Sequence, residues 1–207
     1  MSAEVKTGGA RRPRLTPLPR LATLIGVVSS RAIEIRRPAP GEGPQVRALR
    51  LRALSDAPEA FSSSLELELE RSPAYWEHLA RRSAVGDAHD ESVLFVAIDD
   101  GHWAAMTASF WFDRPARIAQ LWGMWVEPSM RGRGLGRRLV AQVAGWAADR
   151  GAVRLRLGVV ERASEVAAFY ERLGFARTGE TKSLTPDDTA FFLAKELGPA
   201  NLAHGAR

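Results

Sequence analysis

Apolar segments and alternating apolar and polar residues, separated by turn residues, predict seven β-strands along the chain. Residues 153–160 (VRLRLGVV) show the alternation of a strand with one buried face. An Asp-Gly turn at residues 99–101 joins two of the strands into a hairpin, and a turn at residues 113–115 adds a third strand. The predicted strands are residues 33–37, 93–98, 103–112, 118–126, 153–160, 175–182 and 189–197.

Apolar residues at helical spacing predict four helices between these strands. Ser72 and Pro73 suit the start of the second helix, because serine caps a helix and proline fits its first turn. Ser164 is predicted to cap the fourth helix. The predicted inward stripe of that helix is Val166, Phe169, Tyr170 and Leu173. The predicted helices are residues 45–54, 73–82, 134–150 and 164–173.

The order of these elements predicts the fold class, which is α/β with an α+β mixed sheet. One strand is followed by two helices, three strands, a helix, a strand, a helix and two strands. The chain has 207 residues, of which 45% are hydrophobic, and this suits one well-buried core. We therefore expect a basic, disordered N-terminal extension (1–32), a single domain (33–198) and a C-terminal tail (199–207).

The positive charge of the chain is concentrated near its N-terminus. The formal net charge is +5, and residues 1–32 carry six basic residues against one acidic residue. The remainder of the chain is therefore formally neutral. Because affinity for nucleic acid depends on a basic surface of the folded part, we expect no nucleic-acid partner.

An apolar run at residues 21–30 follows this basic stretch and weakly resembles a signal peptide. The run is too short to span a bilayer, which takes about 20 apolar residues, and it lacks a cleavage site. We expect no membrane partner and interpret the run as part of the disordered extension. A targeting segment and a start codon placed too far upstream are the alternatives.

The sequence contains no cysteine and four histidines. The absence of cysteine excludes disulfides, thiolate metal ligands and a cysteine nucleophile, and it suits a reducing cytoplasm, which is the location we expect. The histidines are scattered without the spacing of metal ligands, so we expect no metal.

The most informative segment is residues 121–136 (LWGMWVEPSMRGRGLG), which joins a predicted strand, a glycine-rich turn and a helix start. Glycines let the backbone approach an anion closely, and N–H groups at a helix N-terminus point outward without an intrahelical partner. Arginines around the turn add charge-assisted donors. The turn consists of Arg131, Gly132, Arg133, Gly134, Leu135, Gly136 and Arg137. This arrangement predicts a diphosphate site.

Other interpretations of the turn differ in how well they fit. A Walker-type loop requires Gly-Lys-Ser/Thr, whereas Gly136 is followed by Arg137 and Arg138. A dinucleotide-binding turn requires G-x-G-x-x-G in a parallel βαβ unit, whereas here the glycines alternate and the preceding strand closes an antiparallel meander. A structural turn with solvated arginines is the remaining alternative.

The same residues resemble motif A of the GNAT superfamily of N-acetyltransferases. Its signature Arg/Gln-x-x-Gly-x-Gly/Ala stands here as Arg131-x-x-Gly134-x-Gly136. Residues 157–175 resemble motif B of that family, whose ending is matched by residues 169–175 (FYERLGF). The resemblance covers residues 33–197 in the order of elements and residues 119–175 in specific residues.

The resemblance implies acetyl-CoA as a co-substrate and direct attack by an amine in a ternary complex. The backbone of Met124, Trp125 and Val126 would pair with the pantetheine arm and polarise the thioester carbonyl, and residues 131–137 would bind the pyrophosphate. Tyr170 matches the residue that protonates the departing thiolate. Its position on an inward stripe also fits a core tyrosine.

Some positions that matter for catalysis carry weaker signals. Ala163 stands where the family often has an asparagine that contacts the cofactor arm, so we expect no such contact here. Candidate general bases, acting directly or through water, are Glu66, Glu68, Glu70 and Glu161. Most tryptophans are expected in the core, with one or two lining an acceptor pocket.

These observations predict an acetyl-CoA-dependent N-acetyltransferase. The acceptor would be a primary amine of a small molecule or of a protein. The alternative is a catalytically inactive, CoA-binding regulatory module. We expect a monomer or a homodimer.

Overall fold

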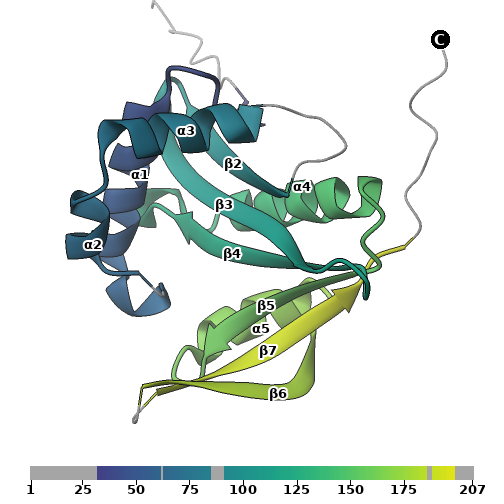
Figure 1. Cartoon of the computed structure of the whole chain (residues 1–207). Helices are drawn as coiled ribbons and strands as arrows, with labels where there is room; N and C mark the ends of the chain where they lie inside the picture. The colour runs from purple at the N-terminus through teal and green to yellow at the C-terminus, as the bar shows by residue number, and fades with distance from the viewer. Residues whose placement is uncertain (1–31, 62, 85–90, 186–187, 199–207) are drawn as a thin grey trace, which may run out of the picture. The chain divides into compact units, whose positions relative to one another are not determined.

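A mixed β-sheet with helices on its faces forms the described part of the protein (Figure 1). The computed structural model describes residues 32–198, apart from residue 62, residues 85–90 and residues 186–187. The predictions for residues 1–31 and 199–207 therefore lie outside the described residues. The predicted fold class, an α/β domain with a mixed sheet, is confirmed.

The sheet has seven strands: β1 (Glu34–Arg36), β2 (Ser92–Asp99), β3 (His102–Asp113), β4 (Ile118–Val126), β5 (Arg154–Val160), β6 (Ala176–Thr185) and β7 (Asp188–Glu196). They lie in the order β1-β2-β3-β4-β5-β7-β6. Strands β4 and β5 run parallel, and all other neighbours in this sheet are antiparallel. The predicted meander of three strands is thus confirmed as β2, β3 and β4.

The turn between β2 and β3 has the conformation that its residues predict. Asp100 and Gly101 both have positive φ angles, 47° and 84°. A two-residue hairpin loop of this kind matches the twist of the strands it joins, and it requires residues that tolerate the left-handed region. The Asp-Gly pair therefore fixes the register of the hairpin.

Strand β4 is irregular at the centre of the sheet. Met106 pairs with Trp125 and Ala108 with Trp122, so Gly123 and Met124 together oppose one residue of β3 and form a β-bulge. Gly123 has a φ of 63°, which a residue with a side chain adopts only with strain.

Strands β4 and β5 pair over three residues each, residues 118–120 with residues 154–156. Among the described residues, no pairing continues beyond these positions. The two strands therefore separate toward the C-terminal end of β4. Figure 1 shows β4 and β5 diverging from their common start.

Five α-helices and two short 3₁₀-helices are described. Helices α1 and α3 share a core with one face of β2, β3 and β4, and α4 and α5 share a second core with the opposite face of the sheet. The bounds are α1 (Gly43–Asp56), η1 (Pro58–Ala60), α2 (Leu65–Leu69), α3 (Pro73–Ala84), η2 (Pro128–Met130), α4 (Leu135–Asp149) and α5 (Ser164–Arg172).

Two helical features differ from the sequence prediction. The predictions lacked α2, because its sequence LELEL alternates in polarity as a strand does. Ser64 caps this helix, its Oγ accepting from Leu67 N–H at 3.4 Å. In α5 the cap residue is Ala163 and not Ser164, and Val166 is 44% exposed, so the predicted inward stripe was wrong there.

Candidate active site

The turn between β4 and α4 is an open, backbone-lined surface. Gly132 and Gly134 have φ angles of 76° and 77°, and a Cβ added to either would meet no heavy atom within 4 Å among the described residues. Gly134 is the N-cap of α4, and none of the described side chains caps it. The amides of the first helical turn therefore point outward without an intrahelical acceptor. This is the geometry of an anion site.

Gly136 has a different role, because it lies where three elements meet. A Cβ on Gly136 would lie 3.0 Å from Met124 Cε of β4 and 3.0 Å from Phe169 Cζ of α5. The absence of a side chain thus permits β4, α4 and α5 to approach closely. The two motifs recognised in the sequence are brought together at this contact.

Two arginines of the turn are held by the protein itself. Arg131 donates from Nε to the Val126 carbonyl at 2.9 Å and from Nη2 to Asp56 Oδ2. The Nη1 of Arg133 lies 2.9 Å from Met130 Sδ and 3.7 Å from Asp99 Oδ2. Arg137, on the first turn of α4, is exposed. Arg137 therefore differs from Arg131 and Arg133, because no such contact to another side chain or carbonyl is found for it among the described residues.

The C-terminal end of β4 presents backbone groups to the side from which β5 diverges. Glu127 N–H donates to the Ala104 carbonyl of β3 at 2.8 Å. Since backbone groups of successive residues in a strand point to opposite sides, those of Val126 point away from β3 and those of Trp125 toward it. Trp125 and Val126 are both predicted to contact the cofactor. Of the two, Val126 therefore directs its N–H into the space between β4 and the diverging β5.

Trp125 contributes through its side chain to a small network at the end of α1. Its Nε1 donates to Asp56 Oδ2 at 2.8 Å, and Asp56 also accepts from Arg131. The Trp125 hydrogen bond and the Arg131 guanidinium lower the pKa of Asp56. Asp56 therefore joins α1, β4 and the glycine turn. Sequence reasoning did not identify this residue, because its two partners, Trp125 and Arg131, are distant from it along the chain.

Tyr170 lies in the core beneath this region. Its ring is 5% exposed and makes edge contacts with Phe169 and Phe175, at centroid distances of 5.0 and 5.6 Å. Burial raises the pKa of the Tyr170 phenol, so the hydroxyl stays protonated at neutral pH. Phe169, the preceding residue, contacts Gly136, so α5 brings Tyr170 near the start of α4.

The candidate general bases differ in their surroundings. Glu66, Glu70 and Glu161 are exposed, whereas Glu68 is 7% exposed. Glu68 lies 3.7 Å from Arg50 and lines a small cavity between the helices and strands β2–β4. Trp122, 43% exposed, lines the same cavity, while Trp76, Trp103 and Trp125 are buried as expected of core tryptophans.

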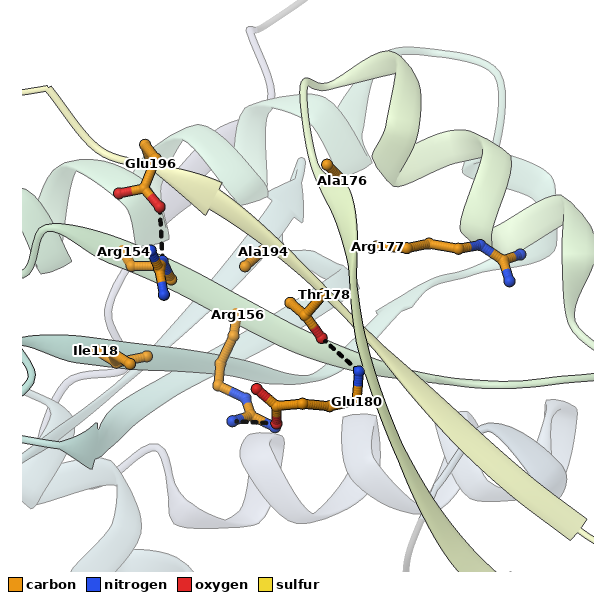
Figure 2. A pocket seen from close by; sticks show the side chains of 9 residues that line it. All are labelled: Ile118, Arg154, Arg156, Ala176, Arg177, Thr178, Glu180, Ala194 and Glu196. Atoms are coloured by element: carbon orange, nitrogen blue, oxygen red, sulfur yellow. Dashed lines mark hydrogen bonds and ion pairs between the residues drawn. The ribbon is translucent and has the colours of Figure 1, made fainter.

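A larger cavity of about 360 Å³ lies on the sheet face opposite α5 (Figure 2). Two of its three arginines are paired beside it: Arg154 with Glu196 at 2.6 Å, and Arg156 with Glu180 at 3.2 Å. Figure 2 shows Arg177 pointing away from both of these pairs. None of the residues predicted to bind the cofactor lines this cavity, so we do not assign the cofactor to it.

Comparison with known proteins decides the family. The family model described as "Acetyltransferase (GNAT) family" matches residues 54–175, more than half of the chain. The chain belongs to the GNAT family. The match spans α2 to α5 and includes the glycine turn, the diverging strands and Tyr170.

Curated relatives of this GNAT chain carry acetyltransferase names. The mycothiol acetyltransferase of Beutenbergia cavernae is 32% identical over 62% of this chain and 39% of its own length. That of Salinispora tropica is 30% identical over 81% of this chain and 50% of its own length. The chain thus spans half or less of these relatives. The peptidyl-lysine N-acetyltransferase YjaB of Salmonella typhimurium is 26% identical over 72% of this chain and 88% of its own length.

Solved structures share the GNAT fold at lower sequence identity. An acetyltransferase of the GNAT family from Streptococcus pneumoniae superposes with a TM-score of 0.67 at 19% identity, covering 81% of this chain and all of the other. The PaiA N-acetyltransferase from Thermoplasma acidophilum, solved in complex with coenzyme A, has a TM-score of 0.63 at 16% identity, with coverage of 80% and 99%. Within the described parts of the chain, we find no helix long and apolar enough to cross a membrane.

Proposed function

We propose that this GNAT protein is an acetyl-CoA-dependent N-acetyltransferase that acts on a primary amine. The observation that carries the proposal is the open glycine turn at the start of α4, which follows the edge of β4 that β5 leaves unpaired. An anion site and an unpaired strand edge there match the two parts of coenzyme A, its pyrophosphate and its extended pantetheine arm.

The residues around the turn suit the pyrophosphate. The open space at Gly132 and Gly134 lets phosphate oxygens reach backbone N–H groups, and a Cβ would occupy that space. Arg137 adds an exposed cation on the same helical turn. Arg131 and Arg133 hold the turn in place through contacts with Asp56, Val126 and Met130.

The pantetheine arm would pair with the free edge of β4. The N–H of Val126 faces this edge, and Met124, two residues earlier, is part of the bulge. Trp125 contributes through the Asp56 contact of its side chain, which fixes the end of the strand.

In the proposed reaction a neutral amine attacks the acetyl carbonyl. The C–N bond forms, the C–S bond breaks, the amine loses a proton to a base, and the thiolate of coenzyme A accepts a proton. Tyr170 is protonated and buried, so it suits a donor to the sulfur. Because the raised pKa keeps the phenol protonated, we expect Tyr170 to stabilise the departing sulfur by donating a hydrogen bond to it.

The relatives support an amine acceptor and leave its size open. One group is named for mycothiol and another relative for peptidyl-lysine, so a small molecule and a protein amine both remain within the proposal. The absence of cysteine from the sequence fits the cytoplasm as the proposed location.

Calorimetric titration with acetyl-CoA and desulfo-CoA, followed by a thiol-release assay over a panel of amines, tests the proposal. We expect binding of both cofactors and thiol release that Tyr170→Phe slows by about 10- to 100-fold. Failure to bind any form of coenzyme A would overturn the proposal. Binding without thiol release across the panel would instead favour an inactive regulatory module.

A further inference from the structure

A small cavity beside the β4 bulge contains a buried ion pair. The cavity has a volume of about 50 Å³ and lies between α1, α2 and α3 on one side and β2, β3 and β4 on the other. Among the described residues that line it, Arg50 and Glu68 are the only charged ones. Tyr75 and Trp122 also line it and are 39% and 43% exposed, so the cavity has a mouth at the surface.

The ion pair is incompletely satisfied. Arg50 and Glu68 are 5% and 7% exposed, and their nearest atoms, Arg50 Nη2 and Glu68 Oε1, are 3.7 Å apart. Arg50 Nη1 and Glu68 Oε2 have no hydrogen-bond partner among the described protein atoms. A buried polar atom without a partner is costly, and most for charged groups, so this arrangement calls for a ligand with matching chemistry.

The position of Arg50 places it next to the proposed reaction centre. A Cβ built on Gly123, in the bulge, would lie 4.0 Å from Arg50 Nη1. The guanidinium also lies 6.0 Å from the ring centroid of Trp122 and 4.5 Å from that of Phe61. Gly123 directly precedes residues 124–126, whose backbone is proposed to meet the pantetheine arm and the thioester. A group bound to Arg50 Nη1 would therefore be close to the acetyl carbonyl.

The charge around the cavity favours an anion. Arg71 Nε lies 3.9 Å from Glu68 Oε2, so two guanidinium groups flank one carboxylate. The cluster therefore carries one net positive charge. A planar carboxylate suits a guanidinium donor, and a cavity of about 50 Å³ has room for a group of that size, because about 10–15 Å³ of such volume holds one water.

We propose that the acceptor amine carries a carboxylate close to its amino group, as an α-amino acid does, and that Arg50 Nη1 binds this carboxylate. This inference rests on the proposed N-acetyltransferase function and adds the class of acceptor. Arg50 then determines specificity, because it places the amine at the end of the bulge next to the thioester. Trp122 and Tyr75, at the mouth, face the remainder of the acceptor.

The test compares L-amino acids with their α-amides, beginning with phenylalanine, methionine and threonine, in the thiol-release assay. Wild type should favour the acid over its amide by about 10- to 100-fold in kcat/KM, mostly through KM. Arg50→Met should bring this ratio to about one, whereas Arg50→Lys should retain part of it. Arg47→Met, on the same helix and not lining the cavity, should leave the ratio unchanged.

The acid-to-amide ratio of kcat/KM does not change when a variant only loses activity. It therefore distinguishes a change in specificity from a loss of stability. Thermal unfolding of each variant, and of the double variant Arg50→Met/Glu68→Gln, monitors folding. An acid-to-amide ratio near one in wild type, or a ratio that Arg50→Met leaves intact, would overturn the inference. Preference for phosphoethanolamine over every amino acid would overturn it as well, since it assigns a phosphate and not a carboxylate.

Failure of this inference can be told from failure of the proposed function. If amines release thiol but acids and amides react alike, the acceptor class is wrong and the transferase remains. If no amine releases thiol, calorimetry of the same acids and amides with CoA-saturated protein tests Arg50 alone. Wild type should then bind the acid and Arg50→Met should not; equal binding by the two proteins contradicts the inference.

Discussion

The glycine turn offers a substitution whose effects on stability and on cofactor binding should separate. Gly134 has a φ of 77° and open space around its missing side chain. Gly179, in β6, has a φ of 83° and equally open surroundings among the described residues. Gly134→Ala and Gly179→Ala therefore impose the same backbone strain, about 1–2 kcal/mol, without a steric clash. For a domain of this size the melting temperature should fall by about 2 to 8 °C in each variant.

The two variants should differ in their affinity for coenzyme A. The new Cβ at position 134 lies where the phosphate oxygens are proposed to approach the backbone, and one charge-assisted hydrogen bond is worth about 1.5–3 kcal/mol. We expect Gly134→Ala to weaken the calorimetric Kd for coenzyme A by about 10- to 100-fold. Gly179→Ala should leave the Kd unchanged.

Two results would refute this reasoning. If Gly134→Ala loses stability but binds coenzyme A as wild type does, the turn is not the pyrophosphate site. If Gly179→Ala weakens binding as much as Gly134→Ala, the effect arises from general destabilisation of the fold and says nothing about the turn.

Further predictions concern three side chains of the site. Arg137→Gln should weaken coenzyme A binding by about tenfold in calorimetry at low salt, whereas an unchanged Kd would remove Arg137 from the pyrophosphate site. Asp56→Asn should cost at most about 1 kcal/mol in thermal melts, since Asp56 and Arg131 are partly exposed. The lowered pKa of Asp56 means that this advantage of wild type exists above about pH 4 and disappears as the pH falls further; a difference that persists at pH 2.5 would contradict it. Because burial raises the pKa of Tyr170 in the folded state, the contribution of this residue to the free energy of unfolding is fully present below about pH 10. As the pH rises above that value, this contribution falls by about 1.4 kcal/mol per pH unit. Wild type should therefore lose stability faster than Tyr170→Phe above pH 10, and parallel curves would argue against a buried phenol.

The sequence predicted the strands well because their ends carry turn residues. Asp100 and Gly101 adopt the left-handed conformation expected of them, and Gly151 and Gly174, which directly follow the predicted helices 134–150 and 164–173, have φ angles of 86° and 87°. Local chemistry was sufficient in these cases. It failed for α2, where alternating Leu and Glu suggested no helix, and at Ala163, which caps α5 although it lacks a capping side chain.

The candidate site was predictable where it is contiguous in the chain. The glycine turn and the residues before it were found from the motif, while their backbone directions required the register of β4 with β3. The partnerships of Asp56 with Arg131 and of Arg50 with Glu68 depend on the packing of α1 against other elements. No pattern along the sequence encodes such contacts, so Asp56 and Arg50 emerged from the structure alone.

The short pairing of β4 with β5 has a consequence for the exchange of amide hydrogens with solvent. Central strands of a sheet normally exchange slowest, because each is bonded on both sides. Here three residue pairs join a four-stranded half to a three-stranded half, and β4 beyond Gln120 lacks a partner strand on its β5 side among the described residues. If the pantetheine arm pairs with this edge as proposed, slow exchange at Val126 would depend on the bound arm. Exchange at the centre of the sheet would then measure how much of the protein has bound its proposed co-substrate.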